Sequence, residues 1–269
     1  MKIVSFNINS IRARPHQLIH LRDNIDPDVI GLQETKVNDP EFPVDEIKEI
    51  GYHSEFWGQK GHYGVAILSK KKPENVQKGF KGDTENDQKR FIQGTFKWKR
   101  KKITIMNGYF PQGENRSHVT KFPKKIKFYD DLENHIKKLK KVEDNLIVMG
   151  DFNVAPSQLD IGIGELNVKR WLRDGKTAFL PEEIEMWNKI KELGFVDSWR
   201  KQNPDERSIF SWFDYRSRMF DDSPKRGLRI DHILLSENLE HSIKNTGIDY
   251  KARAMEKPSD HCPIWLELK

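Results

Sequence analysis

The sequence contains a single cysteine, Cys262, among its 269 residues. One cysteine cannot form an internal disulfide bond, and it cannot supply the several thiolates of a structural zinc site. Stability must therefore come from a packed core, which a chain of this length is able to bury. The absence of disulfide bonds also predicts a reducing compartment, and we expect a cytoplasmic protein.

Long apolar runs are missing as well. No stretch approaches the roughly 18 consecutive apolar residues that a membrane-spanning helix requires. The first residues, MKIVSFNINS, already alternate like a strand and leave no room for a targeting peptide. We therefore expect no membrane association.

Three common catalytic motifs are absent. The sequence has no GxxxxGK[ST] phosphate loop and no GxGxxG dinucleotide fingerprint, because the GIG at 162–164 is too short to count. It also has no GxSxG turn of the kind that carries a nucleophilic serine. These absences argue against P-loop nucleotide chemistry, nicotinamide chemistry and serine hydrolysis.

Positive charge is in moderate excess. The chain has 47 Lys and Arg against 41 Asp and Glu, which gives a formal net charge of +6. Basic residues gather in KWKRKK (97–102), KFPKKIK (121–127) and KKLKK (137–141). Such runs favour a polyanionic partner, since Lys and Arg displace counterions from phosphates. Each run alone is equally consistent with a solvated helix face or a hairpin tip, so charge does not settle the function.

Strand-like and helix-like patterns alternate along the whole chain, without a linker, a repeat or a low-complexity segment. This predicts an α/β or α+β fold in one domain that spans residues 1–269. One amphipathic helix is expected at 124–141, with an apolar stripe of Ile126, Tyr129, Leu132, Ile136 and Leu139. Another is expected at 181–194, with Pro181 in its first turn, a stripe of Ile184, Trp187 and Ile190, and Gly194 as its stop signal.

Several expected strands share one unusual feature, which is a polar side chain other than a turn former at or near one end. A single such residue is usually a turn or a helix cap. Here five or six strands carry such residues, and strand ends are where α/β proteins place their sites. The residues concerned are Asn7, Glu34, Tyr109, Asp151, Asn153, Asp231, Asp260 and His261.

Carboxylates outnumber imidazoles in this set. Hard oxygen ligands favour Mg²⁺, with Mn²⁺ as a substitute, over zinc. A metal held by one or two carboxylates is typical of phosphate-ester chemistry, in which it neutralises developing charge. Asp151 is a candidate to take a proton from water, while Asn7, Asn153 and His261 are candidates to stabilise the transition state. Asp231 is suited to orient His261 or to keep it protonated. The residues therefore predict metal-assisted hydrolysis of a phosphodiester.

Four short blocks resemble the signature of a known superfamily: LQET around Glu34, GDFN at 150–153, RIDH at 229–232 and SDH at 259–261. These blocks are typical of the exonuclease–endonuclease–phosphatase superfamily. Longer stretches, including SFNINSIRARPHQL, GQKGHYGVAIL, LDIGIGELNVKRWL and SWFDYRS, are similar to the exonuclease III family of abasic-site endonucleases. The resemblance covers the whole chain.

The resemblance implies a four-layer α/β sandwich, with two mixed β-sheets packed face to face and helices outside. It also implies a Mg²⁺-dependent DNA repair hydrolase that cuts 5′ to abasic sites, degrades duplex DNA from 3′ ends, and removes 3′ phosphates and other blocking groups. The expected partner is double-stranded DNA with abasic sites or blocked 3′ ends, bound by a monomer.

Residue roles follow from the same resemblance. Glu34 ligates the metal, Asn7 and Asp260 lie close to it, and Asp151 positions the water as base or proton donor. Asn153 stabilises the transition state, and it and Asp151 also count among the expected metal residues. Tyr109 contacts the phosphate.

His261, supported by Asp231, contacts the scissile phosphate in this family. Asp260 and His261 are adjacent because one loop must serve both metal and phosphate, and the flanking Pro258 and Pro263 restrict that loop. At His232 the chain departs from the bacterial exonuclease III pattern, which has an aliphatic residue at this position. Since neighbouring strand residues face opposite sides, we expect His232 to point away from the pocket.

Further residues are predicted to contact DNA. Trp212 and Phe213 in SWFDYRS could belong to the core, but Arg216 beside them suggests a loop that holds an extruded abasic sugar. Arg90 and Gln112 are the other candidates for phosphate contacts. Two alternative functions remain open: a phosphatase of inositol phosphates or lipids, and a DNA-binding protein that has lost catalysis. The second is disfavoured because every expected catalytic residue is present.

Overall fold

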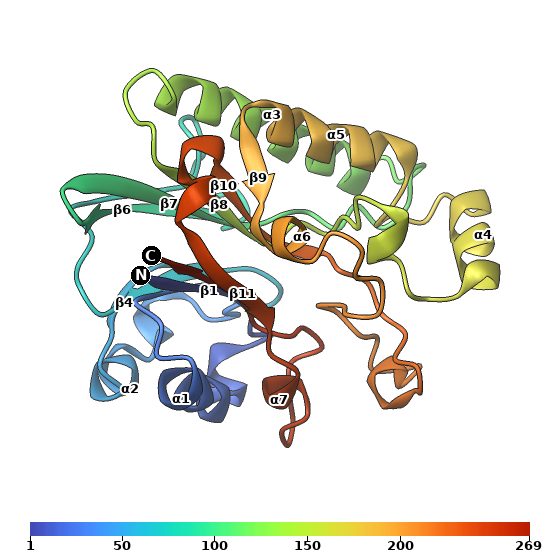
Figure 1. The fold of residues 1–269 in the computed structure, drawn as a ribbon, viewed down its shortest axis with the longest axis horizontal. Coiled ribbons are helices and arrows are strands. Elements are labelled where there is room, and N and C mark those ends of the chain that lie inside the picture. The colour runs from blue at the N-terminus through green and yellow to red at the C-terminus, as the bar shows by residue number, and fades with distance from the viewer.

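The computed structural model describes residues 1–269 and contains two six-stranded β-sheets (Figure 1). The first sheet has the order β11-β12-β1-β2-β4-β3 and the second has the order β5-β6-β7-β8-β10-β9. Strands β1 and β2 are parallel, as are β7 and β8, while the remaining pairs are antiparallel. Both sheets are therefore mixed, as the resemblance implied.

The strands of the first sheet are β1 (Lys2–Asn7), β2 (Val29–Gln33), β3 (His53–Trp57), β4 (Val65–Ser69), β11 (Ile243–Ile248) and β12 (Ile264–Leu268). Those of the second sheet are β5 (Asn75–Lys78), β6 (Phe91–Trp98), β7 (Lys101–Tyr109), β8 (Leu146–Asp151), β9 (Phe195–Asp197) and β10 (Asp231–Ser236). The α-helices are α1 (Pro15–Asn24), α2 (Val44–Glu49), α3 (Lys121–Leu139), α4 (Glu165–Arg173), α5 (Pro181–Glu192), α6 (Ser198–Gln202) and α7 (Tyr250–Arg253). Short 3₁₀ helices are η1 (Ile11–Ala13), η2 (Asp39–Glu41), η3 (Gln158–Asp160), η4 (Met219–Asp221) and η5 (Glu237–Ser242).

The core is divided by the sheets into layers. Between the sheets, residues such as Ile3 and Val29 of the first sheet pack against Ile105 and Ile147 of the second. Outside the first sheet, α1 and α2 cover its other face, and outside the second sheet α3 and α5 do the same (Figure 1). The four-layer sandwich is confirmed.

Strand β1 illustrates how alternation builds these layers. Val4 and Phe6 face the helix side, whereas Ile3 and Asn7 face the second sheet. Successive residues of a strand point to opposite faces, so a polar residue at the strand end can be aimed between the sheets.

The helix predictions are confirmed in position, with one error. Helix α5 spans Pro181–Glu192, and Gly194 follows it with φ of +87°. Helix α3 buries Tyr129, Leu132 and Ile136, but Ile126 is 39% exposed. The prediction that Ile126 belongs to the core is wrong because the buried face passes through Lys125 and Phe128 instead.

None of the helices combines the length and the apolar character required to cross a membrane.

Candidate active site

Three neighbouring strands of the second sheet place polar side chains in one row. Tyr109 at the end of β7 is in register with Asp151 at the end of β8, and Asp151 is in register with Asp231 at the start of β10. Residues in register on adjacent strands share a face of the sheet. The three side chains therefore face the first sheet together, at one end of the sandwich.

The backbone beneath this row is tightly packed at Gly150. Its φ is +147°, and a Cβ atom built there would lie 1.9 Å from the carbonyl oxygen of Gly108 on the neighbouring strand. Only glycine lets β7 and β8 approach this closely. The glycine before Asp151 is thus required for the register that aligns Asp151 with Tyr109.

Asn7 links the two sheets at the site. Its Nδ2 donates to Oε1 of Glu34 at 3.0 Å and to Oδ2 of Asp151 at 3.0 Å, while its Oδ1 accepts the backbone N–H of Asn9 at 3.1 Å. The amide is completely buried. It therefore fixes one carboxylate from each sheet relative to the other.

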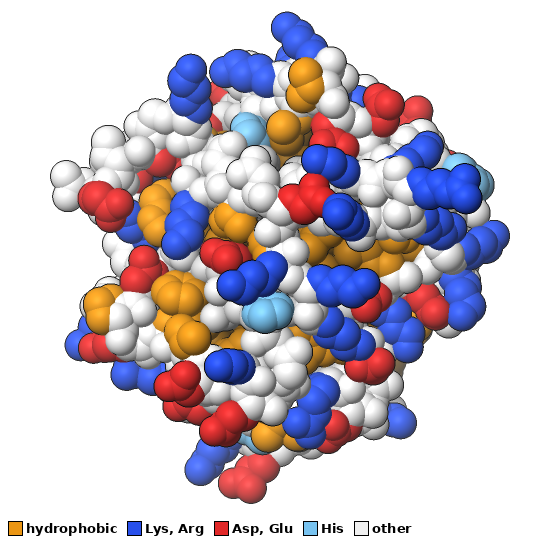
Figure 2. Space-filling view, turned by 90° about the vertical axis from the view of Figure 1, so that its left-hand side faces the viewer, with side chains coloured by type: hydrophobic (Ala, Val, Ile, Leu, Met, Phe, Trp, Pro, Cys, Tyr) orange, Lys and Arg blue, Asp and Glu red, His pale blue; other side chains and the backbone are white.

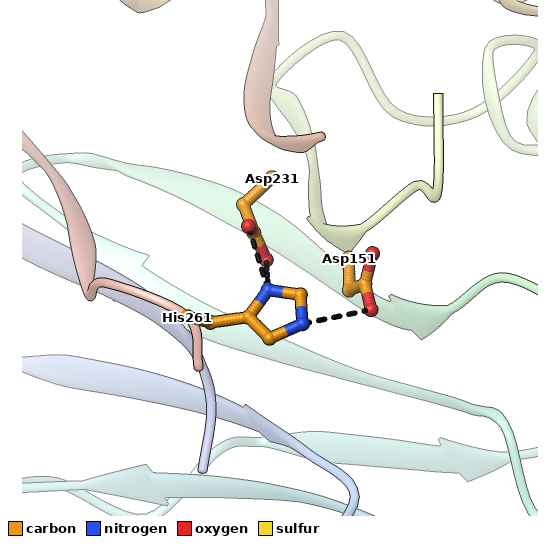
Figure 3. Close-up of side chains that lie close together, drawn as sticks. All are labelled: Asp151, Asp231 and His261. Atoms are coloured by element: carbon orange, nitrogen blue, oxygen red, sulfur yellow. Dashed lines mark hydrogen bonds and ion pairs between the residues drawn. The ribbon is translucent and has the colours of Figure 1, made fainter. Parts of the chain in front are cut away.

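His261 lies between two of the carboxylates (Figure 3). Its Nδ1 is 2.9 Å from Oδ2 of Asp231, and its Nε2 is 3.7 Å from Oδ2 of Asp151. Burial by itself would lower the pKa of His261, but the carboxylates of Asp231 and Asp151 outweigh burial and raise this pKa to about 10. The imidazole is therefore a cation at neutral pH.

Asp151 carries the opposite perturbation. Burial raises the pKa of its carboxyl to about 7, and the negative charges of Asp231 and Glu34 act in the same direction against the His261 cation. Above this pH the cluster combines an ionised Asp151 with a protonated His261. A carboxylate and an imidazolium side by side can accept a proton and stabilise an anion, respectively.

Two site residues adopt a left-handed backbone conformation that side chains rarely take. Glu34 and Asn153 both have φ of +52°. Such strain costs roughly 1–3 kcal/mol and occurs preferentially where function fixes a side chain. The N–H of Asn153 donates to Oδ1 of Asp151 at 3.0 Å, and its Nδ2 donates to the Phe110 carbonyl at 3.0 Å. In this conformation Asn153 bonds both to the Asp151 carboxylate and to the Phe110 carbonyl.

The loop before β12 supplies Asp260 and His261 from a well-fixed backbone. Ser259 Oγ donates to the Asn7 carbonyl at 2.6 Å, and the Cys262 N–H donates to the Ser211 carbonyl at 2.6 Å. The Cys262 thiol is fully buried, and burial raises its pKa. The loop therefore joins the first strand to the segment around residue 211.

Asp260 has both carboxylate oxygens occupied. Oδ1 accepts from Nδ2 of Asn9 at 3.0 Å, and Oδ2 accepts from Nε1 of Trp212 at 3.1 Å. The second contact ties the indole of Trp212 directly to the site. Asp260 thus links the expected metal region to the expected DNA-contact loop.

The cluster opens into a pocket of about 360 Å³. Nine of the residues predicted from the sequence line this pocket. They are Glu34, Tyr109, Gln112, Asp151, Asn153, Trp212, Arg216, Asp260 and His261. Asn7 and Asp231 lie buried and hold lining residues in place.

Two of the residues predicted to contact DNA lie outside the pocket lining. Phe213, expected to contact DNA, is fully buried in an apolar cluster, so that prediction is wrong for this structure. The Arg90 guanidinium lies over the rings of Tyr63 and Tyr109, at 4.7 and 4.5 Å, and donates to the Tyr109 carbonyl at 3.0 Å. It therefore holds Tyr109 in place.

His232 points away from the site, as expected. Its ring lies 3.0 Å from Nη1 of Arg229 and 2.8 Å from the Val154 carbonyl, in a buried network with Asp197. Sequence reasoning missed seven of the 16 lining residues, among them Trp171 and Lys176. The Lys176 ammonium lies 3.6 Å from the centre of a Trp171 ring.

The donors present fit a hard divalent cation on one side of the cluster. Burial is the main cause of the raised pKa of Asp151, and the negative charges of Asp231 and Glu34 add to it. A cation beside these carboxylates would offset that negative charge. Asp151, Asp231 and His261 also have ligand atoms within 4.8 Å of one another. A metal there would need a neutral imidazole, and the raised pKa of His261 opposes this. Glu34 and Asp151, both bonded to the Asn7 amide, are the other carboxylates of the cluster that could hold a metal.

The sequence profile of the endonuclease/exonuclease/phosphatase family matches residues 4–261. The chain belongs to this family. An exodeoxyribonuclease III from Haemophilus influenzae is 53% identical over 269 residues, which cover 100% of both chains.

Two solved structures of the family share the fold over the full length of this chain. A 3′ phosphatase from Neisseria bound to a product DNA hairpin has a TM-score of 0.91 and 32% identity, covering 100% of this chain and 99% of that one. An AP endonuclease from Archaeoglobus fulgidus has a TM-score of 0.88 and 34% identity, with the same coverage.

A buried ion pair lies next to the backbone of two pocket residues, Gln112 and Asn153. Lys125, from the basic run at 121–127, is 0% exposed and pairs with Glu183 of α5, which is also 0% exposed. Its ammonium also donates to the Asn153 carbonyl at 2.9 Å and to the Gln112 carbonyl at 3.3 Å. This lysine is therefore part of the scaffold beneath the pocket and not a solvated charge.

We expect Lys125→Met to lower the free energy of unfolding by about 3–5 kcal/mol, because Glu183 would be left as an uncompensated buried charge. Urea denaturation measures this directly. Lys124→Met removes the same charge at the exposed neighbouring position and should change stability by less than about 0.5 kcal/mol. Equal losses in the two variants would contradict the structural role of Lys125.

Proposed function

We propose that this protein is a Mg²⁺-dependent DNA repair nuclease of the exodeoxyribonuclease III type. It would incise DNA 5′ to abasic sites, degrade duplex DNA from 3′ ends, and remove 3′ phosphates and related blocks. The observation that carries the proposal is one cluster in which Glu34, Asp151 and a protonated His261 line a pocket and the buried Asn7 joins the two carboxylates. The names and activities of the relatives support it.

In this proposal Asp151 takes a proton from the attacking water, because its carboxylate is ionised above about pH 7 and lies at the pocket floor. His261 stabilises the charge that develops on the phosphate oxygens, and Asp231 keeps it protonated. Burial and the Glu34 carboxylate raise the pKa of Tyr109, so its phenol remains a hydrogen-bond donor for the phosphate.

Glu34 and Asp151, with Asn7 and Asn153 beside them and Asp260 nearby, would hold the Mg²⁺. When bound, the metal would supply positive charge to the phosphate and the leaving oxygen. Trp212, Arg216 and Gln112 are proposed to contact the DNA from the pocket rim, where all three line the opening.

We expect Glu34→Gln to raise the Mg²⁺ concentration for half-maximal cleavage by more than about tenfold, since even indirect changes at metal sites cost about 10–100-fold in affinity. Calorimetric titration of the protein with Mg²⁺, without DNA, provides an independent readout. Glu192→Gln, which makes the same change at an exposed residue, is the control. An unchanged titration for Glu34→Gln would remove Glu34 from the metal site.

The direct test of the function is incision of a labelled duplex that carries one abasic-site analogue, with Mg²⁺ and with excess chelator. Incision 5′ to the lesion that the chelator abolishes is the expected result. A folded protein that leaves the duplex intact but hydrolyses inositol phosphates or lipid head groups would overturn the proposal in favour of a phosphatase. The monomeric state, the single domain over 1–269 and the cytoplasmic location stay predictions.

A further inference from the structure

A second hollow, of about 410 Å³, lies at the opposite end of the sandwich from the active site. Strands β1 and β7 begin beside it and end at the active site. Strand β7 has nine residues, so at about 3.3 Å per residue the two ends lie roughly 26 Å apart. A ligand in this hollow is therefore separate from the pocket described above.

Both sheets contribute lysines to the hollow. Lys70, Lys71 and Lys72 follow β4 of the first sheet, whereas Lys97 and Lys99 belong to the β6–β7 hairpin of the second. Figure 2 views the molecule from the side on which this hairpin turns, and Lys and Arg side chains are spread over that face. Segments separated in the chain by more than twenty residues thus bring like charges together.

Carboxylates neutralise only part of this group. Asp28 and Glu74 also line the hollow, and Asp28 lies 4.0 Å from the N-terminal ammonium. Lys70 pairs with Asp26 at 2.6 Å, and Lys97 shares Glu74 with Lys102, at 3.6 and 2.9 Å. Lys71, Lys72 and Lys99 form no ion pair and are exposed. Like charges that gather without partners destabilise the folded state, and this arrangement is suited to an anionic ligand.

An aromatic side chain stands among these lysines. Trp98 is half-buried, and the Lys99 ammonium lies 5.0 Å from the centre of its ring. Beneath it, Phe96 and Val29 form a buried apolar floor. Lysines around an aromatic ring are the combination that binds unpaired nucleic acid, because phosphates contact the cations and a base stacks on the ring.

We propose that this hollow is a second nucleic-acid site, which binds single-stranded DNA through Lys71, Lys72, Lys99 and Trp98. A duplex keeps its base faces stacked internally, so an unpaired strand makes better use of the indole. An acidic peptide would use the lysines but has no ring to stack. The proposal rests on the function proposed above in one respect: shortening a duplex from its 3′ ends leaves the opposite strand unpaired.

The test is fluorescence anisotropy of a labelled oligo(dT) of about 20 nucleotides, in excess chelator so that it is not cleaved. For Lys71→Gln/Lys99→Gln we expect affinity to fall about tenfold and the slope of log K against log salt to fall by about 1.4, since each phosphate contact on a single strand contributes about 0.7. The matched control is Lys138→Gln/Lys141→Gln, which removes two exposed charges from the end of α3 without touching the hollow. It should change affinity less than about twofold.

Equal losses in the two double variants would overturn the proposal, because they would reveal a general effect of net charge. It would also fail if only an oligoglutamate peptide, and not oligo(dT), lost affinity in Lys71→Gln/Lys99→Gln. That result would assign the hollow to an acidic protein. Incision of a short abasic duplex is measured in parallel and should be unchanged in both variants. If the unsubstituted protein fails to incise the duplex, the proposed function is contradicted. The oligo(dT) binding measurement would still test the second site, because it does not depend on cleavage.

Discussion

Asp151→Asn is expected to lower the rate of DNA cleavage by about 10²- to 10⁴-fold, the range that a positioned acid or base contributes. The substitution preserves shape and still offers Asn7 a carbonyl oxygen, but it cannot take a proton from water. DNA binding should persist because the pocket rim, with Trp212 and Arg216, is unchanged. Single-turnover cleavage and binding in chelator separate the two effects.

Asp205→Asn makes the same chemical change at an exposed residue that forms no ion pair. It should leave both the cleavage rate and the DNA affinity unchanged. Thermal unfolding of both variants checks that the fold is retained. Weakened DNA binding with normal turnover in Asp151→Asn would contradict a proton-handling role. It would instead place Asp151 among the residues that hold the substrate.

Asp231→Asn is expected to lower the pKa of His261 from about 10 by about 1–3 units, the effect of removing an opposite charge in direct contact. The active form in our proposal has a protonated imidazole, so activity declines as pH rises through this pKa. The upper limb of the pH profile of kcat/KM should therefore move to lower pH. NMR titration of the His261 ring reports the same shift without substrate.

The sign of the stability effect follows from the same pKa. In the unfolded chain His261 has a pKa of about 6.5, so its raised folded-state pKa contributes stability that is fully present below that pH and is lost as pH rises towards about 10. Asp231→Asn should flatten this part of the stability profile, whereas Asp205→Asn should not. An unchanged upper limb and an unchanged NMR titration would show that Asp231 does not control the protonation of His261.

Much of the site was predictable because strand alternation and the residue types at strand ends are local properties of the sequence. Tyr109, Asp151 and Asp231 each end or begin an apolar run, and the register of three strands then aligns them. The same alternation correctly placed His232 on the opposite face from Asp231. The family resemblance added the sandwich, which periodicity alone left open between α/β and α+β.

Features that depend on contacts between distant segments were not predictable. Lys125 lies in a run that looks solvated, and only its approach to Glu183, 58 residues away, accounts for its burial. Trp212 and Phe213 are adjacent and both aromatic, yet one lines the pocket and the other fills the core. An irregular loop has no repeating pattern of buried and exposed positions, so the sequence does not predict which of the two side chains points outward.

The buried thiol beside His261 has a practical consequence. A thiol reagent can reach Cys262 only when its loop separates from Ser211, because the side chain is fully buried. If closing is faster than modification, the labelling rate divided by the rate for an unfolded chain gives the equilibrium constant for that opening. Labelling of this single thiol would therefore measure the fraction of molecules in which the segment carrying Asp260 and His261 is open.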